Sequence, residues 1–145
     1  MTRQATLQDL EQVTTLFDGY RVFYRKESDI NSARIFLKER LELNDSIIYV
    51  DEQEGVLTGF TQLYPLFSST RMKKLWLLND LYVDPKFRGK GISLQLLDKG
   101  KELAVESGAC AVMLETEKTN NIGNQLYPRA GFTLNTESNF YEWSV

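Results

Sequence analysis

One stretch of strand, turn and helix character constrains the fold of this chain more than any other. Residues 75–83 are mostly apolar, with only Asn79-Asp80 interrupting the run, and Asp84-Pro85 ends it. A turn with two glycines, Arg88-Gly89-Lys90-Gly91, then leads directly into residues with helical apolar spacing. Such an apolar run is typical of a central strand that is covered on both faces. The sequence therefore predicts a strand–turn–helix unit inside an α/β domain.

The turn itself has the character of an anion site. Successive N–H groups at a helix N-terminus point at one spot, and the helix dipole adds about half a positive charge there. Arg88 and Lys90 add further positive charge. The alternative is a plain turn whose glycines only satisfy backbone dihedral angles. The stretch matches neither GxxxxGK[ST] nor GxGxxG, so it is not a P-loop or a dinucleotide-binding fingerprint.

The whole chain, residues 1–145, is predicted to form one continuous α/β domain without linker or repeat. The order β-α-α-β-β-β-α-β-α-β-β is expected, as a mixed sheet. Thr6 is a candidate cap for the first helix, and residues 51–55 form a candidate hairpin turn. The expected helices cover residues 7–24, 31–41, 92–107 and 122–129, and the expected strands cover 2–5, 46–50, 56–64, 75–83, 110–114 (buried) and two segments of the tail 132–145.

Composition excludes several classes of protein. The chain has 145 residues, of which 42% are hydrophobic and 26% charged, as in ordinary globular domains. Its net charge of -3 disfavours a general nucleic-acid binder. The polar start, Met1-Thr2-Arg3-Gln4, and the lack of a long apolar stretch predict neither a signal peptide nor a membrane span. We therefore expect no nucleic-acid or membrane partner.

Cysteine and histidine usage restricts the chemistry. Cys110 is the only cysteine, which allows no internal disulfide or thiolate metal cage and fits a reducing, cytoplasmic compartment. There is no histidine, so triads with histidine, HExxH zinc sites and imidazole bases are excluded, and no metal is expected. We interpret Cys110 as an inert packing residue rather than a nucleophile.

Two blocks resemble the GNAT N-acetyltransferase superfamily. Residues 88–93, after Leu81-Tyr82-Val83-Asp84-Pro85, resemble its acyl-CoA signature [Q/R]xxGx[G/A], with Arg88 and Gly91 matching and Ser93 in place of Gly or Ala. Residues 120–132 resemble its NxxAxxLYxxxGF block, with Gly123 in the usual Ala position. The resemblance implies a mixed, mostly antiparallel sheet of six to seven strands flanked by about four helices.

The resemblance also implies acetyl-CoA as the donor and assigns roles to residues. The backbone at positions 81–83 would pair with the pantetheine arm, and the Leu81 N–H would stabilise the oxyanion. Tyr127 would act as general acid on the leaving thiolate, and Asn120 would bind the pantetheine or acetyl region. The expected cofactor-binding residues are Leu81, Tyr82, Val83, Arg88, Gly89, Lys90, Gly91, Ile92, Ser93, Asn120 and Tyr127.

Tyr127 and Asn120 also have a purely structural interpretation. Tyr127 is placed to pack against Phe132 as an ordinary aromatic residue. Asn120 is placed to cap a helix, a role it can fill together with a functional one.

The general base is left open by the sequence. Polyamine-type relatives have Leu-Glu-Asp where this chain has Leu78-Asn79-Asp80, and Asn79 cannot accept a proton as a carboxylate does. Asp80, Glu115 and a water relay to either remain candidates, and an amine of lowered pKa needs no dedicated base. Alternatively, Asp80 only anchors a loop, and Glu115 is a solvated charge at a strand end.

The acceptor site is the least specified part. Tyr20, Phe23, Tyr24, Tyr64 and Phe67 are candidates for an aromatic acceptor pocket, although such a stripe is more often core. Tyr24, Tyr64 and Glu115 are the candidate substrate-binding residues.

The sequence thus predicts an acetyl-CoA-dependent N-acetyltransferase that acts on a small primary amine by direct attack in a ternary complex. The acidic charge balance favours a cationic acceptor such as a polyamine or a lysine-like metabolite. The alternatives are a protein or peptide N-acetyltransferase and a non-catalytic acyl-CoA sensor. Dimerisation is common in the superfamily, so a homodimer is a further expectation.

Overall fold

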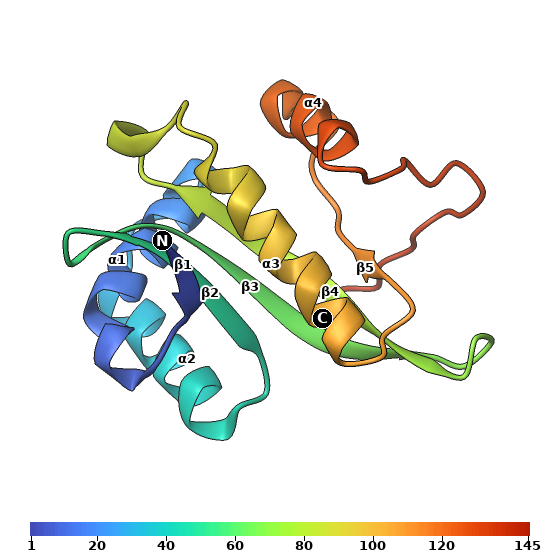
Figure 1. The fold of residues 1–145 in the computed structure, drawn as a ribbon, viewed down its shortest axis with the longest axis horizontal. Coiled ribbons are helices and arrows are strands. Elements are labelled where there is room, and N and C mark those ends of the chain that lie inside the picture. Colours follow the sequence, from blue (N-terminus) through green and yellow to red (C-terminus); the bar gives the residue numbers. More distant parts are fainter. The chain divides into compact units, whose positions relative to one another are not determined.

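The computed structural model describes residues 1–145, which divide into two compact units, residues 1–115 and 116–145 (Figure 1). The first unit contains a five-stranded sheet in the order β1-β2-β3-β4-β5. The strands are β1 (Thr2–Gln4), β2 (Ile47–Gln53), β3 (Val56–Ser68), β4 (Lys73–Val83) and β5 (Val112–Met113). The first four pair antiparallel, and β5 is parallel to β4. The expectation of a mixed, mostly antiparallel sheet is confirmed, with five strands instead of six to seven.

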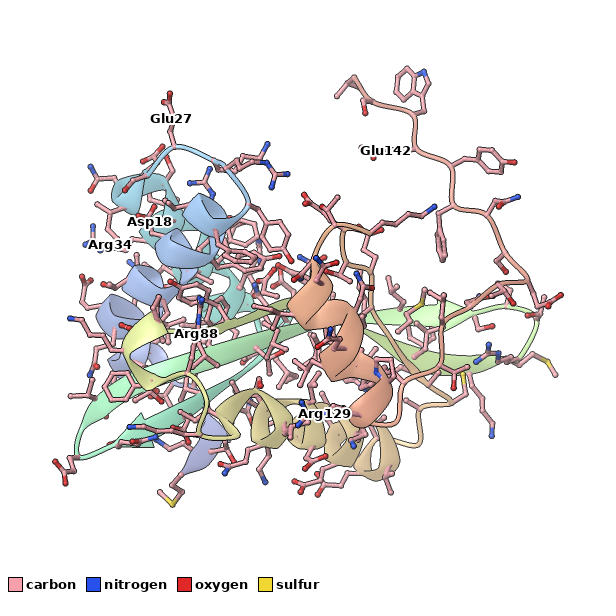
Figure 2. The ribbon with its side chains drawn as sticks, turned by 90° about the horizontal axis from the view of Figure 1, so that it is seen from above. Asp18, Glu27, Arg34, Arg88, Arg129 and Glu142 are labelled. Atoms are coloured by element: carbon pink, nitrogen blue, oxygen red, sulfur yellow. The ribbon has the colours of Figure 1, made fainter.

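Helices cover both faces of this sheet. The short η1 (Leu7–Asp9), α1 (Leu10–Phe23) and α2 (Ile30–Leu43) lie on one face, and α3 (Ile92–Glu106) lies on the other (Figures 1 and 2). Thr6 caps the first turn as expected, because its Oγ1 accepts from the Gln8 N–H and the Asp9 carboxylate accepts from the Thr6 N–H.

The core lies between α1, α2 and the sheet. It contains Val13, Phe17, Leu37, Val50 and Phe60, all buried. On the opposite face α3 packs closely, since a Cβ on Gly100 would lie 3.2 Å from the Leu63 side chain. This packing holds α3, and with it the glycine turn that precedes the helix, against the sheet.

A bulge in β4 interrupts its pairing with β3. Gln62 lies opposite Asp80 and Leu63 lies opposite Leu78, so Asn79 is an extra residue in β4. The side chain of Asn79 is exposed, whereas Asp80 is buried. The Asn79-Asp80 pair that interrupts the apolar run in the sequence therefore marks the bulge.

β5 is shorter and less buried than expected. The predicted strand 110–114 reduces to Val112–Met113, and its residues are half-buried. Because it pairs only with Trp76 and Leu77, the outer edge of β4 beyond Leu77 has no strand partner in this sheet. Cys110 precedes the strand, is half-buried, and has Arg71 Nη1 at 3.6 Å from its sulfur. The expectation of a buried strand was wrong, because no further strand covers the outer edge of β5.

The second unit contains the helix α4 (Asn121–Arg129), which confirms the short helix expected there. The tail, residues 132–145, forms no helix or strand, so the expectation of two strands was wrong. Phe140, Tyr141 and Trp143 are strongly exposed. Alternating apolar residues give strand propensity but do not supply the neighbouring strand that stabilises it. No helix of the chain has the length and apolar character that crossing a membrane requires.

Candidate active site

The turn between β4 and α3 contains the candidate anion site. Gly89 and Gly91 have φ angles of +79° and +78°, and a Cβ at either position would meet open space. Glycine is therefore needed for the backbone angle and not for lack of room. Gly91 is the N-cap of α3, and no side chain caps the first N–H groups of that helix. These N–H groups, at the positive end of the helix dipole, suit a phosphate.

Arg88, the first residue of the predicted signature, is engaged with its own fold. Its Nε donates to the Val83 carbonyl at 2.9 Å, and its guanidinium lies 5.5 Å from the Tyr82 ring and 5.9 Å from the Phe23 ring. Figure 2 shows Arg88 beside the turn and α1. The side chain thus ties the turn to the end of β4 and to α1, which fixes the backbone amides that follow.

The end of β4 exposes backbone groups along one edge. The Asp84 N–H donates to the Thr58 carbonyl of β3 at 2.9 Å. Because N–H groups alternate along a strand, the Tyr82 N–H faces β3, and those of Leu81 and Val83 face the opposite edge. That edge is where β5 has already ended. The Leu81 N–H therefore points to the open edge, as the oxyanion role requires.

A pocket of about 300 Å³ lies between α1, α2 and the sheet. Its walls are mainly aromatic, and the bulged residues of β4 reach it. It contains three of the five aromatic residues expected for an acceptor site, while Phe23 and Phe67 lie outside it and are exposed. The lining residues are Phe17, Tyr20, Arg21, Tyr24, Lys26, Phe36, Tyr64, Asn79 and Asp80.

Asp80 is the buried carboxyl of this pocket, with 2% of its surface exposed. Its oxygens accept from Gln62 Nε2 at 2.6 Å and from Asn79 Nδ2 at 2.8 Å. Burial raises the pKa of Asp80 above its usual range, outweighing these hydrogen bonds and one from Tyr20, which lower it. A carboxylate with a raised pKa is a stronger base at neutral pH than an exposed one.

Tyr64 shares this environment. Burial, and next the negative charge of Asp80, raise the pKa of its phenol, so Tyr64 stays neutral in the pocket. It contributes an aromatic wall and a hydroxyl group, and no charge.

Sequence reasoning missed Gln62, which is fully buried on β3. Ser46 Oγ donates to Gln62 Oε1 at 2.8 Å, which orients the amide so that its NH₂ group faces Asp80. The signal that could have found it is a polar side chain inside a long buried strand, where an amide must find partners. Arg21 and Lys26 were also missed, because charged residues near a helix end usually face solvent.

The other predicted site residues lie elsewhere. Glu115 is exposed and does not line the pocket. In the second unit, Asn120 caps α4 by accepting from the Gly123 N–H at 3.1 Å and donates to Thr116 Oγ1 at 2.9 Å. The Tyr127 ring packs edge-on against Phe132, 6.2 Å between centroids. A Cβ on Gly123 would lie 2.6 Å from Asn120 Nδ2 and 3.2 Å from the Tyr127 ring, so alanine here would require these side chains to shift.

The comparison with known proteins decides the family. Residues 10–132 match the acetyltransferase (GNAT) family. The chain belongs to that family. This GNAT protein is 44% identical over 134 residues to the uncharacterized N-acetyltransferase YhfO of Bacillus subtilis, covering 92% of this chain and 90% of the relative.

Solved structures agree on the GNAT fold. A probable acetyltransferase superposes with a TM-score of 0.94 and 36% identity, over 100% of this chain and 97% of that one. An aminoglycoside N-acetyltransferase in complex with CoA superposes with a TM-score of 0.84 and 19% identity, over 100% and 95% of the two chains, which is a likeness of fold. The protein is a GNAT N-acetyltransferase. Residues 88–93, which resemble the GNAT signature, lie in the turn between β4 and α3 and at the start of α3.

Proposed function

We propose that this N-acetyltransferase takes its acetyl group from acetyl-CoA and transfers it directly to the primary amine of a small molecule. The observation that carries the proposal is the junction of the open β4 edge with the uncapped N-terminus of α3. An extended pantetheine arm fits a strand edge, and a pyrophosphate fits the helix N-terminus that follows it. The CoA bound to the aminoglycoside N-acetyltransferase of similar fold supports the same choice of donor.

Acetyl-CoA, when bound, supplies an acetyl thioester. The Leu81 N–H donates to the carbonyl oxygen as negative charge develops on it, an interaction that is typically worth about 3 kcal/mol. The amine nitrogen forms the new bond to the acetyl carbon while the carbon–sulfur bond breaks. Asp80 accepts the proton that the amine loses. The resemblance of residues 120–132 to the family block is what makes Tyr127 the proposed proton donor to the leaving thiolate.

Asp80 is the better candidate for the base, directly or through a water molecule. It lines the pocket, next along the chain to the proposed oxyanion donor Leu81, and burial raises its pKa. Glu115 is exposed and outside the pocket. Asn79, which replaces the glutamate of polyamine-type relatives, serves instead as a hydrogen-bond donor to Asp80.

The acceptor pocket favours a small amine over a protein substrate. Its aromatic residues come from α1, α2 and β3 and line a space of about 300 Å³ that is partly open to solvent, a volume that suits a small molecule. A polyamine or a lysine-like metabolite has the size and the amine that such a pocket accepts.

The first test is thermal unfolding with and without saturating acetyl-CoA. Ligand at a hundred times its dissociation constant adds about 2.7 kcal/mol to the free energy of unfolding, so the melting temperature should rise clearly. No shift would contradict the donor site. The second step measures free CoA thiol released across a panel of amines, where release confirms transfer. A thermal shift without thiol release for any amine would favour the non-catalytic sensor.

A further inference from the structure

The acceptor pocket has a charge opposite in sign to that of the whole chain. The chain carries a net charge of -3, yet two of the nine pocket residues, Arg21 and Lys26, are cationic and only Asp80 is a carboxylate. Two positive charges and one negative charge therefore line a pocket that otherwise consists of aromatic residues and Asn79. Such a lining does not suit an acceptor that is cationic at every polar end.

The two cations are held together by the way α1 ends. The Lys26 N–H donates to the Arg21 carbonyl at 3.0 Å, and the Arg25 N–H donates to the Val22 carbonyl at 2.9 Å. Arg25 has a φ angle of +63°. These are the two hydrogen bonds of a Schellman motif, here with arginine in the left-handed position that glycine usually takes. The motif fixes Lys26 next to Arg21 at the pocket wall.

Neighbouring acidic groups neutralise this pair only in part. Arg21 Nη1 donates to the Glu27 carbonyl oxygen at 3.1 Å, and its nearest carboxylate is Asp18 at 3.9 Å. Asp18 already accepts from Ser28 Oγ at 2.6 Å and from the Asp29 N–H at 2.8 Å. Figure 2 shows Glu27 pointing outward from its loop. Asp18 and Asp29 thus offset part of the Arg21 charge, and the remaining guanidinium donors and the exposed Lys26 ammonium are the groups available to an added anion.

We propose that the acceptor is an amine that also carries a carboxylate, as an amino acid does, a proposal that rests on the proposed function of the pocket. The reacting amine lies toward Asp80, and the carboxylate binds Arg21 and Lys26. Arginine binds carboxylates well because its planar guanidinium donates two parallel hydrogen bonds. The aromatic walls contact the carbon chain between the two charged ends. A polyamine would instead bring a second ammonium group against the two cations.

A competing explanation is that the two cations only complement the negative end of the α1 dipole. This explanation predicts no effect of a carboxylate on the acceptor. Comparing the binding of matched ligands that differ only in the carboxylate therefore distinguishes the two explanations.

The test measures binding without turnover, by calorimetry on the protein saturated with CoA. Three pairs of an amino acid and its decarboxylated amine are compared, namely lysine with cadaverine, ornithine with putrescine, and phenylalanine with phenylethylamine. Lysinamide, in which the carboxylate is an uncharged amide, separates the effect of charge from that of size. We expect the amino acid to bind about tenfold tighter in at least one pair, with lysinamide behaving like cadaverine. Equal or weaker binding of all three amino acids would overturn the proposal.

Variants connect the preference to the two cations. Arg21→Gln and Lys26→Gln should each bring the ratio of the two dissociation constants close to one, whereas Lys38→Gln, an exposed lysine outside the pocket, should leave it unchanged. An unchanged ratio in both pocket variants would also overturn the proposal. Melting temperatures confirm that the variants are folded. If amino acids bind preferentially but release no thiol from acetyl-CoA, the proposed function fails and the carboxylate site stands.

Discussion

Gln62 Nε2 lies 2.6 Å from Asp80 Oδ2, between paired residues of β3 and β4 that adjoin the bulge. Both side chains are almost completely buried. Since Ser46 fixes the other end of the amide, the carboxylate has a donor whose direction cannot reverse without loss of a second hydrogen bond. Gln62 is thus a positioning residue for the proposed base, and it is not expected to touch the acceptor.

Replacing Gln62 with methionine should therefore alter the base without emptying the core. Gln62→Met keeps the approximate volume but removes a hydrogen bond that lowers the pKa of Asp80. We expect the acidic limb of the pH profile of kcat/KM to move to higher pH and activity to fall at neutral pH. The surface variant Gln8→Met is the control. An unchanged acidic limb would contradict the positioning role.

Asp80→Asn should change the pH dependence of stability as well as activity. Because the folded-state pKa of Asp80 is raised, the protonated carboxyl favours the folded state, and this contribution is lost as pH rises through that pKa. Asparagine cannot ionise, so the stability of the variant does not fall in this way as pH rises. The melting temperature of the variant relative to wild type should thus increase as pH rises above the usual pKa range of an aspartate. A difference that is constant with pH would show that Asp80 does not titrate as proposed.

The same variant tests catalysis. Removal of a general base typically costs about 10²–10⁴-fold in rate. We expect thiol release by Asp80→Asn to fall by an amount in this range and to lose the acidic limb of its pH profile. Wild-type turnover and profile would remove Asp80 as the base.

Tyr127→Phe tests the general acid. The ring and its edge-on contact with Phe132 are retained, so the fold should be preserved. We expect kcat to fall by about 10²-fold or more, with little change in the dissociation constant of acetyl-CoA. Stopped assays of thiol release and a binding titration measure the two quantities. Equal losses in both would indicate a structural role instead.

Gly91→Asp tests the anion site at the start of α3. The variant places a carboxylate at the N-cap, where the proposed pyrophosphate binds, and should weaken acetyl-CoA binding by about tenfold or more. Gly108→Asp is a matched control, because Gly108 follows the other end of α3, has a φ angle of +68° and also faces open space. Both variants carry similar backbone strain, so the main difference is the position of the charge. Similar acetyl-CoA affinity in the two variants would refute this location.

The sequence was sufficient to predict features whose energetic preference lies in a few neighbouring residues. Thr6 and Asp9 form a capping box within four residues, and Gly89 and Gly91 mark backbone angles that other residues rarely adopt. The resemblance to the family signature then selects residues 88–93 as the turn proposed to bind the cofactor. These elements were predictable because the energetic preference lies in the residues themselves.

Features that depend on distant partners were not predictable in the same way. Residues 132–145 alternate like a strand, but the structure forms none there. Gln62 acquires its role from Asp80 and Ser46, which lie 18 and 16 residues away. Arg21 and Lys26 border the pocket only because α1 ends in an unusual turn. In each case the outcome depends on contacts that composition and spacing do not encode.

Asn79, the extra residue in β4, sets the directions of two neighbouring groups that are proposed for the reaction. Asn79 shifts the alternation of the strand by one position, so that Asp80 turns inward while the Leu81 N–H turns to the open edge. Deleting Asn79 would reverse the directions of all the residues of β4 that follow, and the proposed proton acceptor and the proposed oxyanion donor would be misplaced together. Substitutions can therefore adjust either group singly, whereas a change in the length of this strand would affect both at once.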